Sequence, residues 1–278
     1  MRGVSTSSTF SVGDIFTFWP IQQFRILKPG IPLFQNRPMT TRTNWTSTIH
    51  QHDPRWTAVD AYAFSHSHPA SQPNAKALEN ARMASMAAGL PDIALSPAQG
   101  KFLALHCRAS AVTHALEVGT LGGYSAIWVA SENPQLRLTT IEYNPKHVAV
   151  ARKNIELAGL SDRIEVIQGA GIDVLASLRD EVVAGTRPQF GFVFIDADKE
   201  NNWNYFKLAK DMVKSNSVIC VDNVVRGGRL ADLGNTEPYV VASREVVENA
   251  GKEPGVDSVV IQTVGEKSYD GWLWAVVS

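Results

Sequence analysis

From residue 113 onward this chain alternates strand-like and helix-like segments, and this alternation constrains the fold more than any other feature. Short apolar runs rich in β-branched residues are separated by segments with helical periodicity, such as residues 144–160. The strand-like runs are 113–118, 137–141, 163–167, 190–195 and 217–221. Such alternation predicts an α/β fold, in which parallel strands joined by right-handed crossovers form an open sheet with helices on both faces.

Helical segments are also expected ahead of this sheet. Residues 54–67, 74–90 and 96–110 have apolar side chains at three- and four-residue spacing, as in amphipathic helices. Ser96 is the expected N-cap of the third helix, with Pro97 at its first position. These segments are therefore predicted to be accessory helices that precede the first strand.

The two ends of the chain differ from this regular part. Residues 257–264 and 271–278 are strand-like with no helical segment between them, which predicts an antiparallel hairpin at one edge of the sheet. Residues 1–52 are rich in Ser and Thr, contain one acid, and are interrupted by prolines. We therefore expect a basic, poorly ordered extension, rather than an organellar transit segment in residues 1–38, and a single domain over 53–278. Translation starting at Met39 is a further hypothesis.

Composition narrows the classes of partner and compartment. The formal net charge is −1 with a pI near 6.7, so no global positive field would attract nucleic acid or an anionic membrane. No apolar run approaches the roughly 18 to 20 residues that cross a bilayer. Two cysteines, Cys107 and Cys220, are too few for a disulfide framework and favour a reducing compartment, so we expect a cytoplasmic protein with small-molecule or protein partners. His66 and His68 have no evident third metal ligand and are expected at the surface or at a substrate rim.

A glycine-rich turn, LEVGTLGGYSA at residues 116–126, follows the strand-like run at 113–118. Its glycines allow a sharp turn and let a ligand approach the backbone closely. The dinucleotide fingerprint GxGxxG is not met, because Leu121 takes the place of its second glycine. Glu117 would repel phosphates, so the turn favours a cofactor with a cationic amino acid moiety and no phosphate. The simpler alternative is a packing turn that binds nothing.

Glu142 ends the next strand-like run, 23 residues after Gly119. An acid at this position can accept two hydrogen bonds from the cis hydroxyls of a ribose. Both NAD and S-adenosylmethionine carry a ribose, so Glu142 does not distinguish between them. It is also interpretable as a solvated charge before a helix that starts at Asn144 and Pro145.

Oxygen-bearing side chains follow the two strand-like runs at 190–195 and 217–221. If these strands are neighbours, Asp196 from one and Asp222 with Asn223 from the other converge at the same edge of the sheet. Three oxygen donors without Cys or His indicate a site for a hard cation, Mg²⁺ before Ca²⁺ or Mn²⁺. The alternative is that the acids cap strand ends or pair with Lys199 and Arg226.

The motifs LEVGTLGGYSA, TIEYNP, FIDADKENN and DNVVRGG, in this order and at these spacings, resemble those of the cation-dependent class I O-methyltransferases, which include caffeoyl-CoA and catechol O-methyltransferases. The resemblance covers roughly residues 54–278. It implies a Rossmann-like, mostly parallel seven-stranded sheet and a homodimer. It also implies methyl transfer from S-adenosylmethionine to a phenolic or catecholic hydroxyl of a small molecule. The alternatives are an NAD-dependent oxidoreductase and a catalytically silent binding protein of the same fold.

The resemblance implies roles for individual residues. Lys199, beside Asp196, matches the general base of the catechol enzymes. Val225 and Arg226 stand where the plant caffeoyl-CoA enzymes usually have Trp and Asn, so the substrate rim is not predicted by analogy with them. The residues matched to the cofactor are Glu117, Gly119, Thr120 and Ser125 at its methionine end, Glu142 at the ribose, Ala170 by the adenine, and Asp198; those matched to the cation are Asp196, Asp222 and Asn223.

Overall fold

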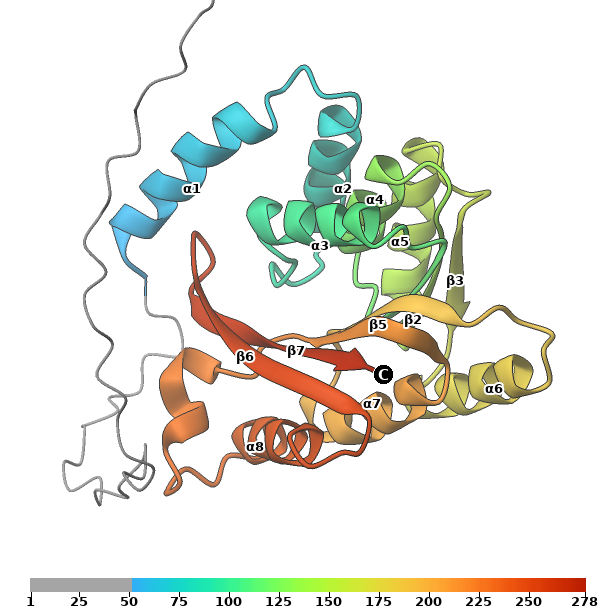
Figure 1. The fold of residues 1–278 in the computed structure, drawn as a ribbon. Helices are drawn as coiled ribbons and strands as arrows, with labels where there is room; N and C mark the ends of the chain where they lie inside the picture. Colours follow the sequence, from blue (N-terminus) through green and yellow to red (C-terminus); the bar gives the residue numbers. More distant parts are fainter. Residues whose placement is uncertain (1–51) are drawn as a thin grey trace, which may run out of the picture. The chain divides into compact units, whose positions relative to one another are not determined.

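The computed structural model describes residues 52–278, which form one seven-stranded sheet with helices on both faces (Figure 1). The expectations for the N-terminal extension and for Met39 lie outside the described residues. The strands are β1 His114–Val118, β2 Arg137–Glu142, β3 Ile164–Gln168, β4 Phe190–Ile195, β5 Val213–Val221, β6 Val256–Val264 and β7 Tyr269–Val277. Their order across the sheet is β3-β2-β1-β4-β5-β7-β6.

The first five strands are parallel, and the C-terminal pair is antiparallel, as predicted. β7 pairs antiparallel with both β5 and β6, so the hairpin joins the sheet through its second strand and leaves β6 at the edge. The order reverses between β1 and β4, and the loops after these strands diverge there to leave room for a ligand. The sequence-based fold class is therefore confirmed.

The core has two layers because successive side chains of a strand point to opposite faces. On β4, Phe192 packs with Leu103 of α3 in one cluster, while the next residue, Val193, packs with Phe206 of α7 in the other. Helices α2 to α5 contribute to the first cluster and α6 to α8 to the second, as Figure 1 shows. The helices are α1 Pro54–Ser67, α2 Ala75–Ala87, α3 Pro97–Ala109, α4 Tyr124–Glu132, α5 Pro145–Leu157, α6 Gly171–Val183, α7 Asn202–Lys210 and α8 Pro238–Ala250.

Two local expectations have different outcomes. Ser96 caps α3 as predicted: its hydroxyl accepts the N–H of Gln99, and the Gln99 side chain accepts the N–H of Ser96 in return. β5, however, begins at Val213 rather than at residue 217. After the buried Val213, residues 214–216 are polar and exposed, and the register shifts between Phe190 and Phe192 of β4, so no apolar alternation marks this part of the strand.

The surface placement of His68 was wrong. His68 is 5% exposed, and its ring lies 4.6 Å from that of Trp128. Burial lowers its pKa, and neither ring nitrogen has a hydrogen-bond partner among the described residues. His66 is exposed, as expected. None of the helices within residues 52–278 has the length and apolar character needed to span a membrane.

Candidate active site

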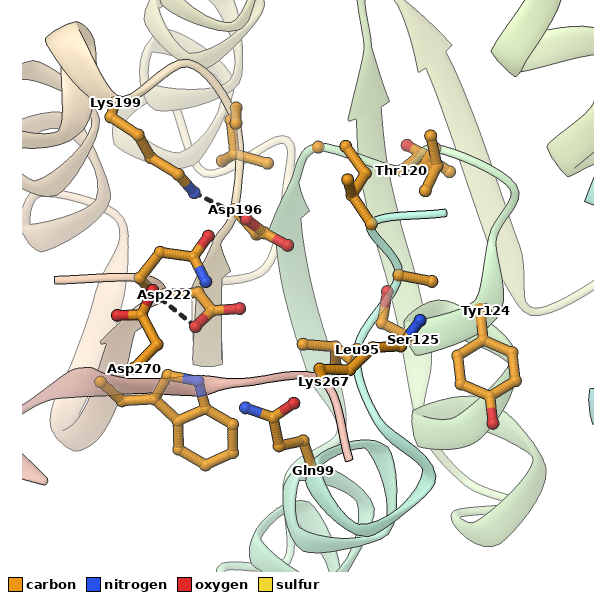
Figure 2. A pocket seen from close by; sticks show the side chains of 18 of the residues that line it. Leu95, Gln99, Thr120, Tyr124, Ser125, Asp196, Lys199, Asp222, Lys267 and Asp270 are labelled. Atoms are coloured by element: carbon orange, nitrogen blue, oxygen red, sulfur yellow. Dashed lines mark hydrogen bonds and ion pairs between the residues drawn. The ribbon is translucent and has the colours of Figure 1, made fainter. Parts of the chain in front are cut away.

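A cavity of about 1170 Å³ opens at the carboxyl ends of the parallel strands. The segments that follow β1, β2, β3, β4 and β5 all contribute to its wall. Figure 2 shows Asp196, Lys199 and Asp222 on one side of it, and Thr120, Ser125 and Tyr124 on the other. The motifs that are separate in the sequence therefore meet at one place, as expected for an open parallel sheet.

The turn after β1 brings the chain into contact with the end of β4. Gly119 has φ +101°, and a Cβ atom there would lie 2.0 Å from the carbonyl oxygen of Asp196. Only glycine fits at this contact. Gly119 thus allows the β1 turn and the Asp196 segment to border the same cavity.

Glu117 lies behind the cavity wall rather than in it. Its side chain is 2% exposed and accepts hydrogen bonds from the hydroxyls of Ser125 and Thr140, the latter at 2.5 Å. Thr140 also contacts the hydroxyl of Thr120 at 2.6 Å. Burial raises the pKa of Glu117 to about 7 although both hydroxyls favour the ionised form. Ser125 and Thr120 line the cavity, so hydrogen-bonded hydroxyl groups connect the Glu117 carboxylate to the cavity wall.

The Glu142 carboxylate accepts hydrogen bonds from backbone N–H groups at the cavity wall. Its Oε2 accepts the N–H of Leu121 at 2.8 Å, and its Oε1 accepts the N–H of Asn144 at 2.9 Å. Nδ1 of His147 lies 3.4 Å from Oε1. Glu142 therefore joins the β1 turn to the start of α5 while it lines the cavity.

Ala170 and Asp198 line the part of the cavity formed after β3 and β4. Ala170 is the N-cap residue of α6. Asp198 accepts hydrogen bonds from the hydroxyl of Tyr205 and from the amide of Asn201, the latter at 2.5 Å. Neighbouring helical residues thus fix the orientation of the Asp198 carboxylate.

The predicted basic and metal-binding residues meet across the ends of β4 and β5. Lys199 Nζ donates to Asp196 Oδ1 at 2.7 Å. Asp222 is 3% exposed, and its Oδ1 accepts the N–H of Asn223 at 2.6 Å. Burial above all, and then the charge of Asp196, raise the pKa of Asp222 to about 8. Two carboxylates therefore face one cavity, and one of them, Asp196, pairs with Lys199.

This donor set fits a divalent cation by its chemistry. Two carboxylates and the amide of Asn223 would supply oxygen ligands, and a cation would favour the ionised form of Asp222, which burial and then the charge of Asp196 disfavour. Within residues 52–278, no group of three acidic, histidine or cysteine side chains is arranged to hold a metal ion. The predicted set does not need one, since its third member is an amide.

Sequence reasoning missed several residues of the wall. Asp270 accepts the backbone N–H groups of Val225, Arg226 and Gly271 at 3.1, 2.8 and 2.9 Å, and so holds the loop after β5. Burial raises its pKa. No motif marks Asp270, which reaches the site only because β7 pairs with β5. Other wall residues that were missed include Leu95, Gln99, Tyr124, His147, Lys267 and Trp272.

Arg226 and Arg229 of the loop after β5 line the cavity. Tyr62, Phe64 and Trp203 do not: Phe64 packs on the core cluster of α3 and α4, and Trp203 stacks on Phe206.

Comparison with known proteins agrees with this geometry. Residues 67–267 match the family model described as O-methyltransferase. The O-methyltransferase imqG of Aspergillus flavus is 49% identical over 246 residues, which are 86% of this chain and 100% of that protein. The catechol O-methyltransferase of Mycobacterium tuberculosis is 47% identical over 203 residues, 72% of this chain and 88% of that protein.

A solved structure shows the same arrangement of elements. The O-methyltransferase from Bacillus cereus, in complex with SAH, superposes with a TM-score of 0.75 at 42% identity, covering 81% of this chain and 99% of that one. The family model covers most of the chain, and the glycine turn and strand-end acids lie at one cavity within the matched residues. This chain belongs to the O-methyltransferase family.

Proposed function

We propose that this protein transfers the methyl group of S-adenosylmethionine to a phenolic or catecholic hydroxyl of a small molecule, with a divalent cation at the acceptor. One observation carries the proposal: the Asp196–Lys199 pair, Asp222 and Asn223 line the same cavity as the glycine-rich turn. The Bacillus cereus relative, solved with SAH, supports the choice of methyl donor.

The donor would bind along the ends of β1 to β4. Gly119, Thr120 and Ser125 would line its methionine end, with Glu117 behind them as the anionic partner of its amino group. Glu142 would hold the ribose, Ala170 would lie by the adenine, and Asp198 would face the cofactor. Bound S-adenosylmethionine supplies an electrophilic methyl group on a sulfonium.

The acceptor would bind on the other side, where Asp196, Asp222 and Asn223 would hold the cation. Mg²⁺ is the first choice, and Ca²⁺ or Mn²⁺ also suit oxygen ligands. A bound cation lowers the pKa of an oxygen that it contacts. Asp222 is buried, so its carboxylate is fixed before any ligand arrives.

Lys199 would act as the general base. Its Nζ lies 2.7 Å from Asp196 Oδ1 and Lys199 lines the cavity, so in its neutral amine form Lys199 would be placed to accept the proton of a hydroxyl bound there. A phenol and a lysine have ordinary pKa values of about 10 and 10.4, so proton transfer between them is nearly balanced. The carboxylate of Asp196 stabilises the ammonium that results.

Methyl transfer to a panel of catechols, flavonoids and hydroxycinnamoyl esters tests this function. We expect turnover that EDTA abolishes and Mg²⁺ restores, and that is lost in Asp222→Ala. Glu156→Ala, an exposed acid on α5, is the matched control and should keep wild-type activity. Full activity in the presence of EDTA would contradict the cation, while SAH binding without turnover of any phenol would contradict the acceptor class.

We also propose a cytoplasmic homodimer. Exposed apolar side chains on α3 and on the edge strand β6 support self-association; they are Phe102, Leu105, Val259 and Ile261. Light scattering of the purified protein should give twice the monomer mass, and a monomer at micromolar concentration would contradict this.

A further inference from the structure

Arg226 differs from the other basic residues of the cavity wall, because no carboxylate pairs with it among residues 52–278. Each of the other lysines and arginines of the wall has a partner. The pairs are Lys199 with Asp196 at 2.7 Å, Lys267 with Asp92 at 2.7 Å, and Arg229 with Glu237 at 2.8 Å. Among the described lysines and arginines of this wall, Arg226 is therefore the one without an ion pair.

The backbone and the neighbours of Arg226 fix its position. Its N–H donates to Asp270 at 2.8 Å, and its φ of +57° lies in the left-handed region. The guanidinium lies 4.5 Å from the ring centre of Tyr239. An arginine stacked by its face on an aromatic ring keeps its N–H edge free for a planar oxygen-bearing group. The backbone of Arg226 is thus held in place, while its guanidinium makes no hydrogen bond with a described residue.

Two buried donors on this wall have no acceptor. Nε of Arg226 and Nε1 of Trp272 are inaccessible to solvent and make no hydrogen bond with any described residue. Trp272 follows Asp270 by two residues on β7, so both side chains point to the same face and line the cavity. Buried donors are costly when unpaired. A ligand in the cavity cannot reach these two buried nitrogens, but Arg226 lines the cavity and its other guanidinium N–H groups are not buried in this way. These groups are donors, so a ligand that binds them should bring acceptor oxygens.

We propose that the acceptor substrate is a hydroxylated aromatic carboxylic acid and that Arg226 binds its carboxylate. This inference rests on the proposed function, since it places the hydroxyl by Asp196 and Asp222 of the same cavity. A carboxylate is planar and presents two oxygens, which match the N–H groups of a guanidinium. It also balances the charge that the chain leaves unpaired. A neutral catechol would leave the Arg226 guanidinium without an ion pair.

A matched pair of acceptors tests the inference: 3,4-dihydroxybenzoic acid and its methyl ester, which share the hydroxyls and differ in charge. The wild-type protein should show kcat/KM about 10- to 100-fold higher for the acid, the size of one charge-assisted hydrogen bond. Arg226→Gln should lower the acid-to-ester ratio to near one, and Arg226→Lys should retain part of it. Lys267→Gln is the control, because it removes the same charge from the same wall but from a paired cation; its ratio should change less than about 3-fold.

Several outcomes would overturn the inference: equal use of acid and ester by the wild-type protein, an unchanged ratio in Arg226→Gln, or an equal fall in Lys267→Gln. Faster turnover of a hydroxycinnamoyl-CoA ester than of its free acid would do the same. Binding of acid and ester to the SAH-saturated protein gives a second readout that needs no turnover. Loss of the acid preference in that assay refutes the role of Arg226, whereas preserved preference without methylation refutes the proposed function alone.

Discussion

Replacing Glu117 by Gln should stabilise the protein without ligand and weaken its binding of the methyl donor. A buried carboxyl whose pKa rises from 4.5 to about 7 destabilises the folded state by about 3 kcal/mol once it is ionised. The pKa of Glu117 is higher in the folded state than in the unfolded state. The free energy of unfolding is therefore unaffected below pH 4.5, where the carboxyl is protonated in both states, and it falls as the pH rises from 4.5 to about 7. Gln removes this loss, since the hydroxyls of Ser125 and Thr140 can each donate or accept.

The gain should therefore depend on pH. At pH 8 we expect Glu117→Gln to be more stable than wild type by about 2 kcal/mol, which corresponds to about 4–8 °C in Tm for a domain of this size. At pH 5 the wild-type carboxyl is protonated in the folded state but already largely ionised in the unfolded state, and the difference should fall below about 1 kcal/mol. In the opposite direction, SAH should bind about 10-fold or more weakly, because a cationic amino group loses its anionic partner.

Thermal melting at pH 5 and pH 8, with ligand-free protein, measures the first effect, and titration calorimetry with SAH measures the second. Glu132→Gln is the control with the opposite sign. Burial acts to raise the pKa of Glu132, but the hydrogen bonds from Lys101 and Arg108 outweigh it and hold the pKa below its usual value. That variant should lose stability at pH 8. A Glu117→Gln protein that is destabilised equally at both pH values, or that binds SAH as tightly as wild type, would refute the reasoning.

Two further changes have clear expected outcomes. Gly119→Ala should lower the free energy of unfolding by about 2–4 kcal/mol, measured by urea denaturation, because the backbone is left-handed and the new Cβ would lie 2.0 Å from the Asp196 carbonyl oxygen; wild-type stability would mean that the turn can move away. Lys199→Ala should remove most of the methyl transfer at neutral pH and less at high pH, where a phenol with a pKa of about 10 ionises without a base. A pH–rate profile checks this, and an equal loss at every pH would argue against the base role.

Most of the sheet could be predicted from the sequence because its strands are buried on both faces and read as continuous apolar runs. β4, with the sequence FGFVFI, is such a strand. The start of β5 could not be found this way, since Lys214, Ser215 and Asn216 are exposed and carry no apolar signal. His68 was misplaced for a related reason: a histidine at a helix end is typical of a surface position, and only the packing of α1 against Trp128 buries it.

Many of the site residues could be predicted because strand ends are marked in the sequence by polar residues after apolar runs. Asp196 and Asp222 are found this way. Asp270 is not, since it lies inside the edge hairpin and approaches the site only through the pairing of β7 with β5. Trp272 reads as a core residue in the sequence, and its place in the cavity wall is seen only in the structure.

Two of the loops that border the cavity, those after β1 and β5, are held by the same kind of hydrogen bond. Leu121 and Arg226 both have left-handed backbone, with φ +49° and +57°, at a cost of about 1–2 kcal/mol each. In each case the N–H of the strained residue donates to a carboxylate at 2.8 Å, Glu142 for Leu121 and Asp270 for Arg226. A hydrogen bond to a charged group contributes about 1.5–3 kcal/mol, enough to offset the strain.

Both acids therefore shape the cavity before any ligand binds. It follows that substitutions of Glu142 would combine two effects, loss of the proposed ribose contact and a relaxed β1 turn. Substitutions of Arg226 that keep its N–H leave the Asp270 contact intact. Side-chain changes at Arg226 thus report on the ligand more directly than changes at either acid.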